Sequence, residues 1–178
     1  MQPVLKKMKS LLGGSKAVLG IDIGSYAIKA VQLEADGGAP KLKAWGHLVL
    51  DPKSEASPEE KRQQAVNALR AFLIQKAVQL KRAATAISGN AVIVRYVKFP
   101  QLTKDELWAT LPTEAEPFIP FDINEVQLGF HILGEMVEEG QKKRETVLVA
   151  AKTEAGQGRV DVLKAAGLKP SIIDVMTP

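Results

Sequence analysis

The sequence predicts an α/β fold in which one mixed sheet is interrupted by a smaller inserted α+β unit. Three observations support this prediction. Short apolar runs separated by turn residues predict a series of strands near the N-terminus. Two apolar stripes at helical spacing predict crossover helices. Between the two helices lies a second group with the pattern of a strand, a helix and two strands. The length of 178 residues suits one good-sized domain or two small ones.

The first elements are expected to be three strands joined by tight turns. Gly24-Ser25 separates the first two strands, and the turn-forming sequence Asp-Gly-Gly-Ala-Pro separates the second from the third. Such short connections favour an antiparallel meander. The expected strands cover residues 17–23, 27–35 and 41–50.

A helix is expected next, because Ser57-Pro58-Glu59-Glu60 combines a cap residue, a first-turn proline and acids at the positive end of the helix dipole. Apolar residues that include Val66, Leu69 and Leu73 then recur at three and four residues. These features predict a helix over about 58–80, and a short strand over 84–88 follows it.

The inserted unit begins with a strand over 91–99, which alternates in polarity. Thr103 and Glu106 form a capping box that starts a helix. Pro112 removes an amide donor within that helix, so we expect a kinked or broken helix there. Two further strands, 125–133 and 145–151, are expected around an acidic turn at 134–144.

A last helix is expected from about Thr153 to Ala166, with a late start because Gly156 and Gly158 lower helix propensity. Gly167 is a natural helix stop, and a buried strand over 171–175 follows. Three antiparallel strands followed by two parallel crossovers make the ribonuclease-H-like half of an actin-type fold. The predicted organisation is a tail at 1–16, a main subdomain at 17–90 plus 152–178, and an inserted subdomain at 91–151.

The charge of the chain is concentrated in its first residues. The chain has 24 Lys and Arg against 20 Asp and Glu. Four lysines account for the excess charge of +4. They are Lys6, Lys7, Lys9 and Lys16, and they lie in a segment without acidic residues. The rest is neutral, so a basic face for nucleic acid is not predicted. The absence of Cys excludes disulfides and thiolate metal sites. No apolar run reaches the length of a membrane helix, and the tail is either solvated or in short contact with anionic lipid.

The chemically informative segment is Gly-Ile-Asp-Ile-Gly-Ser-Tyr-Ala-Ile-Lys, residues 20–29. A buried strand delivers Asp22 near its end, and a glycine turn follows at once. Gly24 permits close approach of a phosphate, Asp22 is suited to hold Mg²⁺ through water, and Lys29 adds a positive charge. The alternative is an ordinary hairpin with a solvated Asp22.

Other candidate motifs are weaker. Residues 12–16 lack the P-loop spacing and precede a strand, whereas a P-loop opens a helix. Gly156-Gln157-Gly158 lacks the third glycine of a dinucleotide loop. His47 and His131 are far apart in sequence and have no partner pattern for a metal.

The stretch Thr113–Asp122 is dense in proline and aromatic residues. Its simplest role is a stapled turn that closes the inserted unit. The functional alternative is a rigid apolar lip that receives a peptide, because prolines reduce the entropy lost when such a lip is ordered. The residues of this lip are Phe118, Ile119, Pro120 and Phe121.

Three segments together resemble one family. GIDIGSYAIKAVQL, EAEPFIPFD and LVAAKTEA…LKAAGLKPSIIDV are similar to PilM, the cytoplasmic actin-like protein of the type IV pilus inner-membrane platform. The resemblance extends from about residue 9 to residue 175. The cell-division protein FtsA shares this architecture.

The resemblance implies an actin-like fold with subdomain 1A at 17–90 and 152–178 and an inserted subdomain 1C at 91–151. It implies ATP and Mg²⁺ as ligands, with Asp22, Gly24, Ser25, Tyr26 and Lys29 in the first phosphate motif. It also implies that the cytoplasmic N-terminal tail of an inner-membrane partner, PilN, binds in a groove between 1A and 1C. The protein would then link this partner to the pilus motor and platform from the cytoplasmic side of the inner membrane, with homo-oligomeric rings as a further possibility.

The chain departs from the family pattern in its length and at four positions. Pro112, Pro117, Gly156 and Gly158 lie where the family usually has helix. The second half of the fold, with the second phosphate motif and the adenosine pocket, is absent, so we expect weak or no ATP affinity and at most weak ATPase activity. No catalytic residue is predicted. Two other functions stay open: an actin- or hexokinase-type ATPase or kinase half, and a cell-division membrane tether similar to FtsA.

Overall fold

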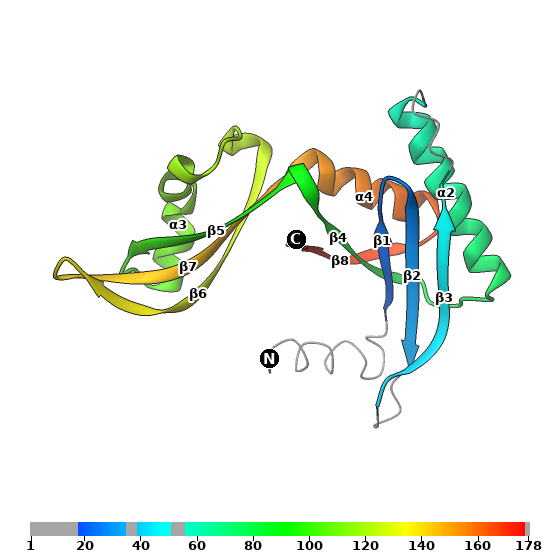
Figure 1. Cartoon of the computed structure of the whole chain (residues 1–178), viewed down its shortest axis with the longest axis horizontal. Helices are drawn as coiled ribbons and strands as arrows, with labels where there is room; N and C mark the ends of the chain where they lie inside the picture. The colour runs from blue at the N-terminus through cyan, green and yellow to red at the C-terminus, as the bar shows by residue number, and fades with distance from the viewer. Residues whose placement is uncertain (1–17, 35–38, 51–55, 177–178) are drawn as a thin grey trace. The chain divides into compact units, whose positions relative to one another are not determined.

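The computed structural model describes residues 18–34, 39–50 and 56–176 (Figure 1). The predicted basic tail at 1–16 lies outside the described residues. The chain forms two compact units, each described by itself below. The first unit joins the N-terminal segment as far as Ala86 to Gly158–Asp174, and the second joins Ile87–Gln157 to the segment from Val175 onwards. The subdomain boundaries predicted at 90/91 and 151/152 stay predictions.

A mixed five-stranded sheet carries the first unit. Its strands lie in the order β3-β2-β1-β4-β8, with β1 antiparallel to β2, β2 antiparallel to β3, and β1 parallel to β4. The predicted meander and the parallel return are therefore confirmed. The bounds are β1 Leu19–Ile23, β2 Ala27–Glu34, β3 Lys41–Val49, β4 Arg82–Ile87 and β8 Lys169–Val175.

Helix α2 (Pro58–Gln75) begins at the predicted signal and ends earlier than predicted. Ser57 Oγ accepts from the Glu60 amide at 3.2 Å, and Glu60 Oε2 accepts from the Ser57 amide at 2.7 Å. At the other end Ala77 has φ 48°, and the Val78 amide donates to the Leu73 carbonyl at 2.9 Å. This is a Schellman end, which usually contains glycine. Because alanine takes the left-handed position here, the sequence carries no visible stop signal.

The core of the first unit lies between the sheet and two helices. Leu19, Ile21 and Ile23 of β1 are buried in one cluster with Leu69 and Phe72 of α2. Val162 and Leu163 join this cluster from helix α4 (Thr153–Ala165). Arg70 donates two hydrogen bonds to the Ala165 carbonyl, at 3.2 and 2.7 Å, and so satisfies a carbonyl at the end of α4. The late start that we predicted for α4 is wrong, because the helix includes both glycines.

The second unit is a three-stranded antiparallel sheet with a helix and a hydrophobic cluster. The strand order is β5-β7-β6. Phe99 and Leu148 from the sheet and Leu107 and Leu111 from α3 are buried together. The elements are η2 Gly89–Ala91, β5 Val92–Pro100, α3 Lys104–Ala115, η3 Glu116–Phe118, η4 Ile123–Glu125, β6 Val126–Glu138 and β7 Gln141–Lys152.

Helix α3 is not broken at Pro112. It continues to Ala115, and the Glu116 amide donates to the Pro112 carbonyl. Leu107, Leu111 and Ala115 recur at four-residue spacing and are fully buried. The free energy gained by burying this stripe offsets the loss of the hydrogen bond that the proline removes. The irregular exit that we predicted does follow, as a 3₁₀ turn over Glu116–Phe118.

The strands of the β6–β7 hairpin are much longer than predicted. Pairing continues to Glu138 and Gln141, so the expected turn at 134–144 shrinks to Glu139 and Gly140. These two residues have φ of 51° and 77°, the pattern of a type I′ hairpin turn. The sequence prediction failed because Glu-Gly is a weak turn signal and because the strand ends are charged.

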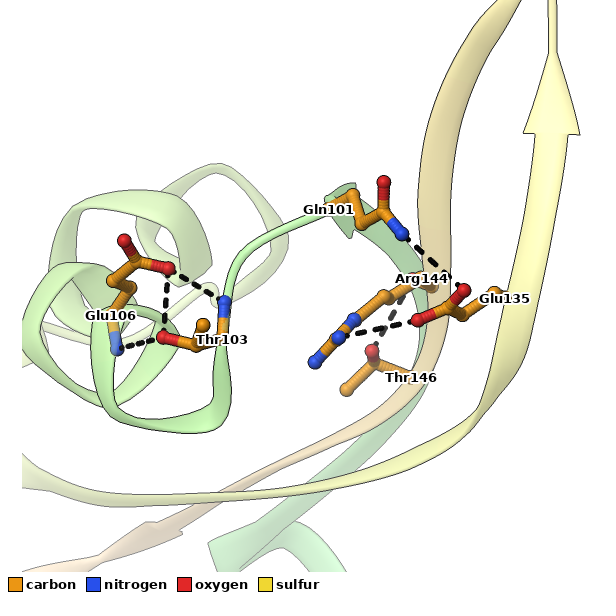
Figure 2. Close-up of polar contacts among 6 residues, drawn as sticks. All are labelled: Gln101, Thr103, Glu106, Glu135, Arg144 and Thr146. Carbon is orange, nitrogen blue, oxygen red and sulfur yellow. Dashed lines mark hydrogen bonds and ion pairs between the residues drawn. The ribbon is translucent and has the colours of Figure 1, made fainter.

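Cross-strand ion pairs hold these charged strand ends together. Arg144 Nη2 donates to Glu135 Oε1 at 3.2 Å, and Gln101 Nε2 donates to Glu135 Oε2 at 3.3 Å (Figure 2). Figure 2 also shows the capping box of α3, in which Thr103 Oγ1 accepts from the Glu106 amide at 3.2 Å. Hydrogen bonds from Thr103, with a smaller contribution from the charge of Arg144, lower the pKa of Glu106.

We expect the stabilising effect of Glu138 to depend on pH. Hydrogen bonds from Lys143 and Lys98 lower the pKa of Glu138 from 4.5 to about 2. A carboxyl group whose pKa is lowered by folding stabilises the folded state at pH values above its ordinary pKa. This stabilisation is lost as the pH falls through about 2. Glu138→Gln should therefore reduce the free energy of unfolding at pH 7 and have a much smaller effect near pH 2, measured by urea unfolding.

A matched control for this prediction is Glu145→Gln. Glu145 is exposed on β7, and no ion pair of Glu145 is found among the described residues. Its replacement should change stability little at either pH. An equal loss of stability for Glu138→Gln at pH 7 and pH 2 would contradict the role of the two lysines.

Candidate phosphate-binding turn

The predicted phosphate motif forms the tight connection between β1 and β2. Asp22 is paired in register with Lys29, and Ile23 with Ile28. The Gly24 amide donates to the Ala27 carbonyl at 3.0 Å and closes the turn. A Cβ at Gly24 would lie 3.0 Å from that same carbonyl oxygen. A side chain at this position would therefore press on backbone, and glycine avoids this contact.

The charged and polar side chains of the motif lie at the surface of this turn. Lys29 Nζ lies 3.5 Å from Asp22 Oδ2, with 67% of the lysine side chain and 35% of the aspartate side chain exposed. Ser25 is exposed, and Tyr26 is 73% exposed. The structure thus brings together the residues that the sequence assigned to the motif: Asp22, Gly24, Ser25, Tyr26 and Lys29.

The charge of Arg159 acts on this turn from another part of the sequence, which sequence reasoning missed. Arg159 lies on α4, and its guanidinium interacts electrostatically with the Asp22 carboxylate. Burial lowers the pKa of Arg159, and the charge of Asp22 raises it. Its Nε atom is buried without a hydrogen-bond partner. The preceding Gly156-Gln157-Gly158 is a sequence signal beside it, although this segment lacks the third glycine of a dinucleotide loop.

The donors at the turn fit the chemistry of a phosphate with a hydrated Mg²⁺. Among the described residues, the amides of Ser25 and Tyr26 donate to no backbone carbonyl. Outside the masked segments, no group of three or more His, Asp or Glu side chains is placed to hold a metal. A cation at Asp22 would therefore take its other ligands from water and phosphate oxygens, as Mg²⁺ commonly does. Here Asp22 would hold the cation, and the two amides and Lys29 would bind the phosphate.

The predicted lip residues have mainly packing contacts within the second unit. The Phe118 ring meets the Phe99 ring edge to face at 6.2 Å, and Ile119 is only 8% exposed. Lys152 Nζ lies 4.7 Å from the centre of the Phe121 ring. These contacts match the stapled-turn alternative. Pro120 is exposed and Phe118 is 38% exposed, so an apolar edge faces solvent.

The fold and the turn can now be compared with known proteins. Residues 20–177 match the family of the type IV pilus assembly protein PilM. The chain belongs to the PilM family. It is also 30% identical, with a TM-score of 0.74, to a chain of the solved PilM–PilN type IV pilus biogenesis complex. This likeness covers 89% of our chain and 47% of that one.

Two other solved structures are similar to this PilM family member. The cytoplasmic domain of EpsL, an inner-membrane component of the type II secretion system of Vibrio cholerae, is 16% identical with a TM-score of 0.59. The likeness covers 90% of our chain and 60% of that domain. A Bacteroides thetaiotaomicron protein with an actin-like ATPase fold and unknown function is 10% identical over 94% of our chain and 53% of its own. The TM-score of this likeness is 0.44.

The likeness to the PilM–PilN complex chain and the strand topology confirm the predicted α/β class, with one mixed sheet and a separate α+β unit on a fold shared with the PilM family. The chain spans about half the length of the PilM relative, with 47% of that chain covered. In residues 18–34, 39–50 and 56–176, no helix combines the length and the apolar character needed to cross a bilayer.

Proposed function

We propose that this protein is a type IV pilus assembly scaffold that binds the cytoplasmic N-terminal tail of a PilN-like inner-membrane protein. The observation that carries the proposal is the likeness to a chain of the PilM–PilN complex over 89% of our chain. Membership in the PilM family supports a role in pilus assembly. In this proposal the protein lies in the cytoplasm beside the inner membrane and couples the tail to the motor and platform.

We further propose that the β1–β2 turn is the first phosphate motif of an ATP site that acts as a conformational switch. The support is local: a glycine turn with free amides, one carboxylate for hydrated Mg²⁺, Lys29 beside this carboxylate, and the charge of Arg159 acting on it. Asp22 would hold the cation, while Lys29 and Arg159 would attract the phosphates. When bound, ATP would supply the phosphate charge that these residues recognise.

The proposed place for the partner's tail includes the exposed edge of Phe118–Phe121. Phe118 is anchored on Phe99, and Pro120 has a fixed backbone φ, so this edge loses little entropy when a peptide binds. Ile119 is buried and contributes by positioning its neighbours. Apolar side chains of the tail would then find a preformed surface.

We expect Phe118→Ser to weaken binding of the partner's tail by about tenfold or more, because exposed aromatic anchors often carry much of a peptide's binding energy. The measurement is calorimetric or fluorescence titration with a synthetic peptide of the PilN-like N-terminus. Thermal unfolding of the same variant reports any loss of stability, since the contact with Phe99 is also removed.

Trp108→Ser is the matched control. Trp108 is 47% exposed and packs on one ring, that of Phe130, at 4.9 Å. The variant therefore removes a comparable aromatic pair from the same unit and should leave peptide affinity unchanged. Equal peptide affinity for the wild type and Phe118→Ser would show that Phe118 is not part of the interface. A peptide that does not bind the wild type would refute the scaffold proposal.

A further inference from the structure

The middle of the sequence is strongly acidic, although the chain beyond its basic tail is neutral in total. Residues 105–141 contain nine Asp or Glu residues and no Lys or Arg. Four of these acids flank the exposed edge Phe118–Phe121, two on each side of it in the sequence. They are Glu114, Glu116, Asp122 and Glu125.

The four acids beside the edge are not neutralised within the described part of the chain. Glu116, Asp122 and Glu125 are exposed, and none of the four has an ion pair among the described residues. Lys152 Nζ lies 4.7 Å from the centre of the Phe121 ring. Its positive charge offsets one of the four negative charges, so three negative charges remain around an apolar edge.

Two of these acids occupy positions that are unfavourable for the fold. Glu114 lies in the last turn of α3 and Glu116 is its C-terminal cap residue, and this turn contains no basic residue. The helix dipole places partial negative charge at this end, so acids here reduce stability unless a cation is close. Acids in such a place point to a positively charged ligand, because departures from local rules are expected at functional sites.

The backbone that carries the acids is held by hydrogen bonds. The Ile119 amide donates to the Glu116 carbonyl at 3.3 Å, and the Glu125 amide donates to the Asp122 carbonyl at 3.0 Å. Asp122 Oδ1 also accepts from the Asn124 amide at 2.9 Å. The acids are therefore held beside the apolar edge, where one short peptide can contact both.

We propose that the edge Phe118–Phe121 and its acids bind a basic apolar peptide, whose apolar side chains cover the edge while its Lys or Arg residues face the acids. This inference rests on the proposed scaffold function and adds the charge of the partner's tail. The cytoplasmic segment beside a membrane-spanning helix carries an excess of Lys and Arg, so an inner-membrane partner supplies this charge. Charges at the rim of an interface mainly raise the association rate and the selectivity.

The test is a titration of the 178-residue chain with two synthetic peptides. One is the N-terminus of the PilN-like protein, and the other has its Lys and Arg residues replaced by Gln. We expect Glu116→Gln combined with Glu125→Gln to weaken the native peptide by about three- to tenfold at low salt. The loss should shrink to less than about twofold at about 0.5 M salt, where charges are screened. The Gln-substituted peptide should bind the wild type and the double variant equally.

Glu139→Gln combined with Glu145→Gln is the matched control, because it removes two exposed carboxylates from the β6–β7 hairpin of the same unit. It should leave the affinity unchanged. Thermal unfolding should show no loss of stability for Glu116→Gln with Glu125→Gln, since an acid is removed from the end of a helix.

Three results would overturn the inference and leave the scaffold proposal standing. They are a native tail without Lys or Arg, equal weakening of both peptides by the double variant, and an equal loss in the matched control. Self-association of the chain in light scattering that the double variant abolishes would also overturn it, because a second copy would then occupy the edge. A native peptide that does not bind the wild type would overturn both proposals.

Discussion

Replacing Gly46 with alanine is expected to destabilise the first unit by about 2–3 kcal/mol. Gly46 lies in β3, and a Cβ there would approach Phe72 Cδ2 to 2.6 Å and Cε2 to 2.7 Å. Phe72 is 2% exposed in the core, so its ring has no open space to move into. Either α2 or β3 must shift to admit the methyl group. Chemical denaturation of the variant measures this cost directly.

Two further variants separate crowding from a general intolerance of alanine in strands. Gly129→Ala adds a methyl group in β6 where nothing lies within 4 Å, and it should have little effect. Phe72→Leu combined with Gly46→Ala should recover part of the lost stability, because the smaller side chain makes room. A double-mutant cycle without coupling would contradict the proposed clash.

Asp22→Asn is expected to remove the Mg²⁺ dependence of ATP binding, a loss of about 10- to 100-fold in the enhancement by the metal. The change keeps the shape of the side chain and deletes its charge. Asp22 then no longer offsets the positive charges of Lys29 and Arg159, so metal-free binding of tripolyphosphate, which has the phosphates of ATP without its nucleoside, should become stronger. The measurement is a titration with ATP and with tripolyphosphate, each with and without Mg²⁺.

The control for Asp22→Asn is Glu34→Gln, which deletes a carboxylate from the next strand. Glu34 Oε2 lies 3.0 Å from Lys43 Nζ, and both side chains are about half exposed. This variant should leave the Mg²⁺ dependence intact. If Asp22→Asn retained the full enhancement by Mg²⁺, Asp22 would not be the carboxylate that serves the metal. Tight ATP binding by the 178-residue chain would also refute our expectation of weak affinity.

Local sequence signals located the element starts better than the element ends. The capping boxes at Ser57 and Thr103 are complete in the structure, because each depends on residues three apart. The end of α2 was missed because alanine, not glycine, takes the left-handed position at residue 77. The β6–β7 hairpin was underestimated because its outer pairs are charged, and such pairs are stabilised only by the strand opposite.

In the candidate site, too, features set by neighbouring residues were predicted, and an interaction made by a distant segment was not. The Gly-Ile-Asp-Ile-Gly-Ser segment by itself determined the strand, the glycine turn and the position of Asp22, because these features depend on neighbours in the chain. The partners of Asp22 differ in how far they could be foreseen. Lys29 lies opposite Asp22 in the hairpin, and the sequence predicted the tight antiparallel turn but not this register. Arg159 becomes a partner only after α4 packs on the sheet through Val162 and Leu163, which tertiary structure alone decides because the two segments are distant in sequence.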